Sequence, residues 1–217
     1  MDKHDNCPLC HSANVEAYTC DKHRSYMQCR CCELVFVERA HYLKREAEKA
    51  IYDLHENAVA DPGYRKFLSR LFIPLSGQLE AQSHGLDFGC GPAPALAEMF
   101  KEQGFHIDVY DSFYCDQKEV FDRQYDFVTA TEVIEHLHQP GEKIRMLWNI
   151  LRRGGCLGIM TKLVTSKQAF QSWHYKNDLT HVCFFSQPTL RWLADSLHAE
   201  VSFYGDDVAI ITKREAY

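Results

Sequence analysis

The chain has 217 residues and a formal charge of −6 at pH 7, and 46% of its residues are hydrophobic. This length fits one full domain with room for a small appendage, and the apolar content is enough to bury a core. The acidic balance argues against a general binder of nucleic acid or of anionic membranes, because both depend on clustered positive charge. The N-terminus lacks an apolar signal segment, and no window approaches the roughly 18 apolar residues of a membrane helix. We therefore expect a cytoplasmic protein.

Cysteines are concentrated at the N-terminus, where six of the ten lie within the first 32 residues. Cys7 and Cys10 form one C-x-x-C pair, and Cys29 and Cys32 form a second pair after a gap of 18 residues. This spacing predicts a zinc ribbon over residues 1–37. Cys31 is an alternative to Cys32 as a ligand, and free or redox-active thiols are the alternative to zinc. Strands are predicted at 15–19, 25–28 and 34–37. We expect a structural domain that helps to cover the substrate side.

Residues 38–83 favour helix and form a predicted connector. Glu, Lys and Ala dominate residues 38–60, and all three are good helix formers. Pro62 suits the first turn of a second helix, which Pro74 kinks or ends.

From residue 84 onward, predicted strands and helices alternate, so we treat residues 84–217 as one domain. Strands are predicted at 84–88, 105–110, 125–130 and 156–161, with a final hairpin within 201–212. Helices are predicted at 92–104, 141–155 and 188–198. This alternation implies an α/β fold with a mostly parallel sheet covered on both faces, and the hairpin must add one antiparallel strand.

A glycine-containing turn follows the first of these strands. In LDFGCG the strand ends at Asp87 and passes through Gly89 and Gly91 into a helix. Glycines let the backbone approach a ligand closely, and open α/β sheets bind ligands beyond their strand ends. Asp111 ends the second strand, where an acidic side chain can bind two ribose hydroxyls. The order predicts a nucleoside-type ligand. A dinucleotide-binding domain is the alternative, but Pro94 stands where its third glycine belongs.

The segments LDFGCG, VYD, YDFVTATEVIEHL and LRRGGCLGIMT together resemble class I S-adenosylmethionine-dependent methyltransferases over residues 84–213. The resemblance implies a Rossmann-like, seven-stranded, mostly parallel sheet with a reversed last strand. Only 13 residues separate Asp111 from Tyr125, so the third strand and its helix must be truncated.

The same resemblance implies roles for the residues of the turn. Gly89 and Gly91 would pass under the methionine part of S-adenosylmethionine, and Asp87 would hold its loop or amino group. Asp111 would bind the ribose. Phe113 is the expected neighbour of adenine.

A carboxylate and histidine motif follows the fourth strand. Glu132, Glu135 and His136 are spaced i, i+3 and i+4, so we expect one helical face to carry them beside the cofactor. His181 lies in a later loop and is the expected fourth ligand of a divalent ion, Mg or Mn. Without a metal, His136 or His181 is a candidate general base. As a further alternative, Glu132 caps the helix or positions the cofactor, Glu135 is a surface residue, and His136 is a hydrogen-bonded pocket residue. Three aromatic-type side chains either shape the pocket or pack the lid: Trp173, His174 and Tyr175.

This E-x-x-E-H motif with a later histidine resembles the metal site of small-RNA 2′-O-methyltransferases. E-x-x-E-H also resembles the ubiquinone-pathway O-methyltransferase. Both resemblances imply that a metal lowers the pKa of a substrate hydroxyl and orients it. We therefore expect O-methylation of a small or medium-sized acceptor. RNA 2′-O-methylation, with its steep salt dependence, and an inactive zinc-ribbon scaffold are the alternatives.

Overall fold

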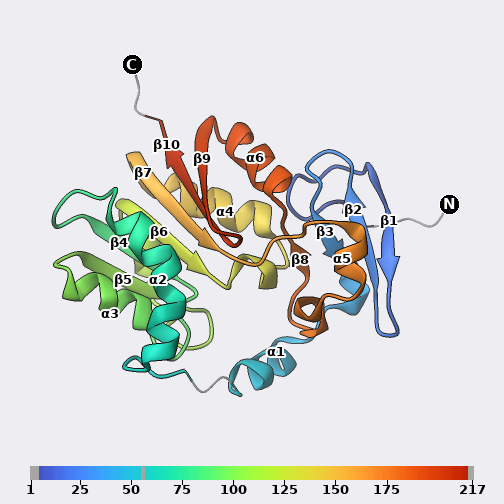
Figure 1. Cartoon of the computed structure of the whole chain (residues 1–217), viewed down its shortest axis with the longest axis horizontal. Helices are drawn as coiled ribbons and strands as arrows, with labels where there is room; N and C mark the ends of the chain where they lie inside the picture. Colours follow the sequence, from blue (N-terminus) through green and yellow to red (C-terminus); the bar gives the residue numbers. More distant parts are fainter. Residues whose placement is uncertain (1–4, 55–56, 215–217) are drawn as a thin grey trace.

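The structure, a computed structural model, describes residues 5–54 and 57–214. Its centre is a six-stranded sheet with the strand order β5-β4-β6-β7-β10-β9 (Figure 1). The strands are β4 (His84–Phe88), β5 (His106–Tyr110), β6 (Tyr125–Thr131), β7 (Leu151–Met160), β9 (Ala199–Tyr204) and β10 (Val208–Lys213). The first four are parallel, and β10 runs antiparallel to both β7 and β9. The predicted α/β class and the reversed last strand are confirmed.

The predicted number of seven strands is wrong, because the described sheet has six. The missing strand is the one expected beyond β5. The segment between β5 and β6 is too short for a strand and a crossover helix, and it forms a bridge from Asp111 to Cys115 and the 3-10 turn η2 (Lys118–Asp122). β5 is therefore an edge strand.

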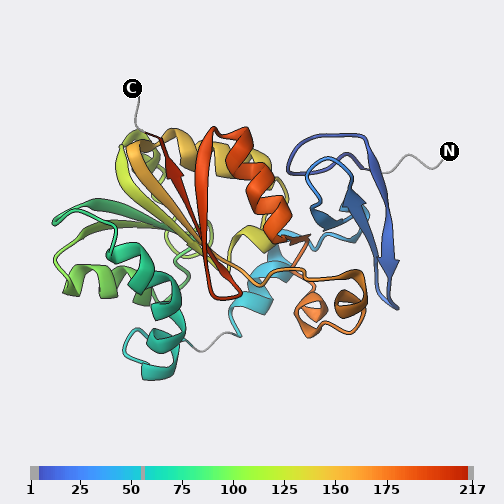
Figure 2. The same cartoon turned by 45° about the horizontal axis from the view of Figure 1, so that its top comes forward.

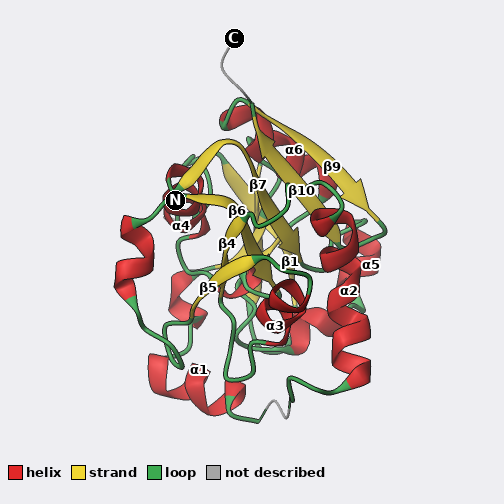
Figure 3. Ribbon diagram, turned by 90° about the vertical axis from the view of Figure 1, so that its left-hand side faces the viewer, coloured by secondary structure: helices red, strands yellow, loops and turns green. Residues whose placement is uncertain are grey.

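Helices cover both faces of the sheet (Figure 3). α2 (Pro62–Ser76) and α3 (Ala95–Glu102) pack on one face, and α4 (Pro140–Asn149) and α6 (Gln187–Ser196) on the other. Gly158 of β7 shows how close this packing is, since a Cβ there would lie 2.9 Å from Leu75 and 3.0 Å from Leu71 of α2. The sheet thus separates two apolar layers, as expected for parallel strands buried on both sides.

The N-terminal segment, residues 5–37, is called the ribbon below. Its strands β1 (Val15–Cys20), β2 (Ser25–Cys29) and β3 (Val35–Val37) form an antiparallel sheet whose fourth member is β8 (Cys183–Phe184). In Figures 1 and 2 the ribbon lies beside α5 (Lys167–Gln171) and α6, on the side away from α3. The backbone of the ribbon also contacts the backbone of α4. A Cβ added to Gly141 of α4 would lie 2.1 Å from the carbonyl oxygen of Leu9 in the ribbon.

The helical predictions need three corrections. The helix expected over 38–60 is a 3-10 turn η1 (Arg39–His41) followed by α1 (Arg45–Tyr52), while residues 55 and 56 lie outside the described residues. Pro74 lies inside α2, which ends two residues later at Ser76. The helix expected over 141–155 ends at Asn149, and β7 has already begun when the chain reaches Gly154, whose φ is +72°. No helix in the described ranges is both long and apolar enough to cross a bilayer.

Candidate active site

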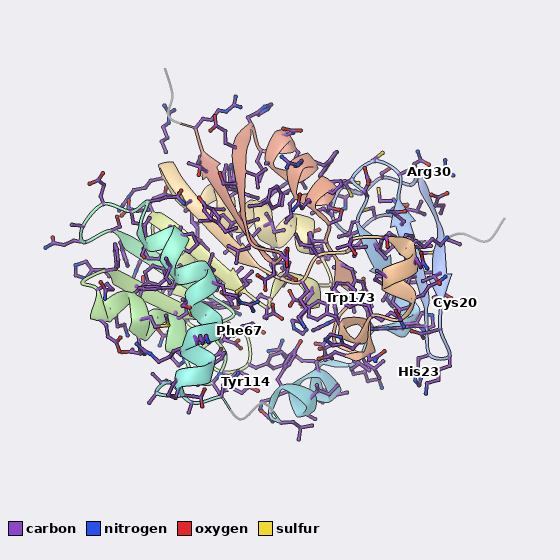
Figure 4. All side chains as sticks on the ribbon, in the orientation of Figure 1. Cys20, His23, Arg30, Phe67, Tyr114 and Trp173 are labelled. Atoms are coloured by element: carbon purple, nitrogen blue, oxygen red, sulfur yellow. The ribbon has the colours of Figure 1, made fainter. Side chains whose placement is uncertain are left out.

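A cavity of about 1190 Å³ lies beside the carboxyl ends of β4, β5 and β6. Its walls include the glycine turn (residues 89–91), the loop after β5, the turn after β6, and helices α1 and α2. Phe67 of α2 and Tyr114 of the β5 loop both line it (Figure 4). The volume exceeds what one small ligand needs, so a nucleoside-type cofactor and an acceptor can share it.

The two glycines of the turn are required for different reasons. Both have left-handed backbones, with φ of +77° at Gly89 and +62° at Gly91. A Cβ on Gly89 would lie 2.4 Å from the Val133 side chain, whereas a Cβ on Gly91 would meet no atom within 4 Å. Gly89 is therefore needed for packing against the turn after β6. Gly91 leaves its backbone open to the cavity.

Asp111 connects the loops that follow β4 and β5. Its Oδ2 accepts a hydrogen bond from the Gly91 amide at 3.1 Å. Its Oδ1 accepts from the amides of Phe113 at 2.8 Å and Tyr114 at 3.2 Å. Because a carboxylate has about four acceptor positions, Asp111 can hold both loops and still accept from ligand hydroxyls.

Asp87 lies beneath the turn, outside the residues that line the cavity. The side chain is buried, and its Oδ1 accepts a hydrogen bond from the Thr129 hydroxyl at 2.7 Å. Burial, together with the nearby Asp111 charge, raises the pKa of Asp87 to about 6. This position favours support of the turn over direct contact with a ligand in the cavity.

Helix α1 forms the wall facing the β5 loop, and the sequence alone suggested only a connector there. The Arg45 guanidinium carbon lies 4.1 Å from the centroid of the Phe113 ring, and the rings of Tyr52 and Phe113 are 5.5 Å apart. The Tyr114 hydroxyl donates to Asp53 at 2.7 Å. A sequence signal existed, because Arg45 and Tyr52 are seven residues apart and therefore share one helix face.

The motif after β6 does not form the expected helical face. The chain leaves β6 at Glu132 with φ of +52°, and only Ile134–His136 makes a 3-10 turn, η3. The Glu132 amide donates to the Met160 carbonyl of β7 at 2.7 Å, which holds this left-handed residue against the sheet. The i, i+3, i+4 argument therefore gave the wrong geometry for Glu132.

Three of the four predicted metal-ligand residues still converge. Glu135, His136 and His181 each offer one ligand atom, and these atoms lie within 4.8 Å of one another. We call these residues the Glu/His cluster. Glu135 is fully buried, and its Oε2 has no hydrogen-bond partner among the described residues. Burial and the neighbouring charge of Glu132 raise the pKa of Glu135. A buried carboxylate oxygen of this kind fits a cation or a proton.

Glu132 is joined to the cluster through Tyr175. The Tyr175 hydroxyl lies 3.2 Å from Glu132 Oε2 and makes a shorter hydrogen bond to Glu135 Oε1. Burial also raises the pKa of Glu132. Tyr175 and its neighbours do not line the cavity, and Trp173 (Figure 4) packs within 5.0 Å of the Tyr175 ring, centroid to centroid. Trp173 and Tyr175 therefore pack against the cluster outside the cavity lining.

The geometry of His181 fixes its tautomer. Its Nδ1 lies 2.7 Å from the Tyr175 carbonyl oxygen, which can only accept, so Nδ1 carries the proton. The lone pair is therefore on Nε2. Burial lowers the pKa of His181, which favours the neutral form of the ring. Asp178 Oδ2, which sequence reasoning missed, lies 3.7 Å from Nε2.

A second missed pair lies further along the cavity wall. His138 Nε2 and Glu48 Oε1 are 2.7 Å apart, and the His138 ring lies 4.3 Å from the Tyr42 ring, centroid to centroid. His138 follows His136 by two residues, so the repeated histidine of EHLH was the available signal.

The N-terminal cysteines gather as their spacing predicted. Cys7 and Cys32 have their sulfurs 3.5 Å apart, those of Cys10 and Cys29 are 3.4 Å apart, and all four lie within 4.8 Å of one another. Such a cluster is compatible with one tetrahedral zinc ion. Cys31 is exposed and contacts Ser12, so Cys32 completes the set.

Comparisons with known proteins agree with this architecture. A family model described as a methyltransferase domain matches residues 60–201, more than half of the chain. The chain therefore belongs to this methyltransferase family, and it is a class I S-adenosylmethionine-dependent methyltransferase. The comparison with curated proteins finds no significant match.

Solved structures share the fold at low sequence identity. An O-methyltransferase family protein from Burkholderia thailandensis has a TM-score of 0.54 at 12% identity, over 78% of this chain and 60% of that chain. A SAM-dependent methyltransferase from Archaeoglobus fulgidus has a TM-score of 0.52 at 16% identity, over 69% and 94% of the two chains. The sugar N-methyltransferase KedS8 from Streptoalloteichus has a TM-score of 0.51 at 14% identity, over 77% of this chain and 93% of that chain. These similarities support the fold alone.

Proposed function

We propose that this enzyme methylates a hydroxyl group of a small or medium-sized acceptor, with a divalent ion assisting. The observation that carries the proposal is the Glu/His cluster, whose two histidines line the cavity that also contains the glycine turn, while Glu135 is buried behind them. S-adenosylmethionine supplies an activated methyl group, so the enzyme's main tasks are to align the acceptor and to manage its proton.

The cofactor half of the cavity has the groups that a nucleoside sulfonium needs. Gly91 leaves its backbone open for close approach, and Gly89 keeps the turn packed. Asp111 is the proposed ribose ligand, while Asp87 supports the turn from beneath. Phe113 is the proposed adenine neighbour, and the Arg45 guanidinium packs over its ring.

Glu135, His136 and His181 are the proposed ligands of Mg or Mn. One carboxylate and two imidazoles suit a divalent ion, and Glu135 Oε2 is otherwise without a partner among the described residues. Such an ion would lower the pKa of an acceptor hydroxyl. Glu132, held by Tyr175, supports the cluster. If the cluster works without metal, His181 Nε2 is the group placed to accept the hydroxyl proton.

We also propose that Cys7, Cys10, Cys29 and Cys32 bind a structural zinc. The chain would then consist of a zinc ribbon over residues 1–37, a connector over 38–83 and a catalytic domain over 84–217. Because α1 of the connector lines the cavity, the connector also takes part in ligand binding.

The test is formation of S-adenosylhomocysteine with a panel of small hydroxyl compounds, before and after removal of loosely bound metal. We expect turnover to fall on chelation, to return with Mg or Mn, and to be lost in Glu135→Gln. The exposed Glu119→Gln is the matched control. Full activity after chelation, with ribbon zinc assayed separately, would refute metal assistance.

The same assay separates the competing functions. Methyl incorporation into RNA that declines steeply with salt would replace the small acceptor with RNA. Turnover with any acceptor eliminates an inactive scaffold.

A further inference from the structure

The loop that carries His181 is held by the ribbon. This loop, residues 176–181, is called the His181 loop. Arg24 lies between β1 and β2 and is only 4% exposed. Its guanidinium donates to three carbonyl oxygens of the loop, at 2.6 Å to Lys176, 2.8 Å to Asp178 and 3.2 Å to Leu179. One side chain thus satisfies three acceptors of a segment about 150 residues further along the chain.

Other ribbon groups fix Arg24 in this position. Its Nε donates to the Tyr26 hydroxyl at 3.1 Å, and that hydroxyl donates to Asp21 at 2.7 Å. Asp21 also forms an ion pair with Lys176 at 2.9 Å, and only 7% of the Lys176 side chain is exposed. Because buried charges are stable only when paired and hydrogen-bonded, this network specifies one position of the loop.

The ribbon also holds the chain on the other side of His181. The Val37 amide donates to the Val182 carbonyl at 2.9 Å, and β3 then pairs with β8 through Phe36 and Cys183. The Val182 amide donates to the Glu135 carbonyl at 2.8 Å. His181 therefore lies between two ribbon-bound segments, and one of these is bonded directly to the turn of the Glu/His cluster.

We propose that the ribbon is a positioning part of the active site and that Arg24 is its positioning residue. Arg24 donates to the Lys176 carbonyl, one residue after the Tyr175 carbonyl that accepts the hydrogen bond from His181 Nδ1. The ribbon thereby sets the ring orientation that presents Nε2 to the cluster. This inference rests on the proposed function, because the orientation of His181 affects turnover only if His181 binds the ion or accepts the hydroxyl proton.

The test compares Arg24→Met and Arg24→Lys with Arg30→Met. Arg30 is a suitable control because it lies in the same ribbon, its side chain is 60% exposed, and it forms an ion pair with Glu16 on the ribbon surface. Each full-length, zinc-loaded protein is examined by amide hydrogen exchange and by the ¹⁵N shifts of the His181 ring at pH 8. Zinc content and S-adenosylmethionine affinity are measured in parallel. None of these readouts requires the acceptor.

In Arg24→Met we expect amide exchange in the His181 loop to accelerate about tenfold or more, the equivalent of one lost charge-assisted hydrogen bond. The ring should lose its fixed Nδ1-protonated tautomer, while zinc content and cofactor affinity stay unchanged. Arg24→Lys keeps the charge but cannot reach three carbonyls at once, so we expect a smaller change in the same direction. Arg30→Met should match the wild type.

Unchanged loop exchange and an unchanged His181 tautomer in Arg24→Met would overturn the proposal. Equal acceleration throughout the six-stranded sheet would also overturn it, since Arg24 would then serve general stability. If Arg24→Met does not fold, Arg24→Lys decides by the same two readouts. Failure of the proposed function looks different, because His181→Asn would then keep full turnover whatever Arg24 does.

Discussion

The Asp111 carboxylate supports two loops through its hydrogen bonds, and we propose that it also binds the ribose of the cofactor. We expect Asp111→Ala to raise the dissociation constant for S-adenosylmethionine about tenfold to hundredfold, because a hydrogen bond to a charged group is worth about 1.5–3 kcal/mol. Isothermal titration calorimetry measures this. The exposed Asp122→Ala should leave the affinity unchanged. An unaltered affinity in Asp111→Ala would contradict the assignment of the ribose ligand.

Asp87 predicts a pH dependence of stability. Its pKa is raised to about 6 in the folded protein, so between its unfolded value of about 3.8 and pH 6 the folded state holds a proton that the unfolded state has released. The stability contributed by this group is therefore complete below the unfolded pKa and is lost as pH rises through 6. Relative to Asp87→Asn, the wild type should lose up to about 3 kcal/mol between pH 4 and 7. Urea unfolding of the cofactor-free wild type and Asp87→Asn across this pH range tests the prediction. If the free energies of unfolding of the two proteins change with pH in parallel, Asp87 is not protonated in the folded state.

Single residues were predictable where one local rule fixes them. Gly89 and Gly91 were predictable as a glycine turn between a strand and a helix, and Asp111 was predictable from its place at the end of the next strand. Glu132 was not predictable in this way. Its left-handed backbone depends on a hydrogen bond to Met160, a partner in another strand.

At the scale of elements, the glycine turn is coupled to the turn after β6. Gly89→Ala should destabilise the protein by about 2–5 kcal/mol, the sum of a left-handed alanine and a clash with Val133. Gly91→Ala has the backbone strain alone, so we expect about 1–2 kcal/mol. Chemical denaturation compares the two. Equal losses would mean that Val133 moves aside without strain.

Gly141 predicts how tightly the ribbon docks on α4. Gly141→Ala would place a methyl group 2.1 Å from the Leu9 carbonyl oxygen, a backbone atom that cannot rotate away. We expect the ribbon to separate from α4 and limited proteolysis to cut the chain faster between residues 30 and 45. Gly77→Ala, where the nearest atom is 3.4 Å from the added Cβ, is the control. Wild-type resistance in Gly141→Ala would show that the ribbon docks without this contact.

Periodicity predicted most strands and helices, but it could not place their ends. The pattern of residues 141–151 continues past Asn149, yet α4 stops there because Tyr125 of β6 pairs with Leu151 at the start of β7. Strand pairing of this kind overrides local helix propensity. The absence of a seventh strand was foreseeable from the short segment after Asp111, although the family resemblance alone implied seven.

At the scale of the whole molecule, we expect bound zinc to stabilise the larger domain as well as the ribbon. We expect Cys7→Ser and Cys32→Ser to lose zinc and to lower the melting temperature of the entire chain, because β8 belongs to the ribbon sheet. Cys20→Ser and Cys31→Ser should retain one zinc per chain, since both thiols are exposed and outside the cluster. Metal analysis with calorimetry measures both effects. Zinc loss in Cys31→Ser with retention in Cys32→Ser would reverse the ligand assignment.

The contacts between the ribbon and the larger domain could not be predicted from the sequence. Cysteine spacing predicted the cluster of four thiols, and the glycine turn with Asp111 predicted one wall of the cavity, where we propose that the cofactor binds. Nothing local indicates that Arg24 bonds to carbonyls near residue 178 or that α1 lines the cavity, because both depend on contacts between distant segments.

The pairing of β3 with β8 also bears on how the chain matures during synthesis. The three N-terminal strands leave the ribosome early, but their fourth strand, Cys183–Phe184, follows only after more than half of the chain has been made. The edge of β3 is exposed during that interval, and an exposed strand edge can pair with other chains. Early metal uptake by the cysteines would shape the nascent ribbon, while the arrival of β8 would close its edge and bring His181 into place in the same event.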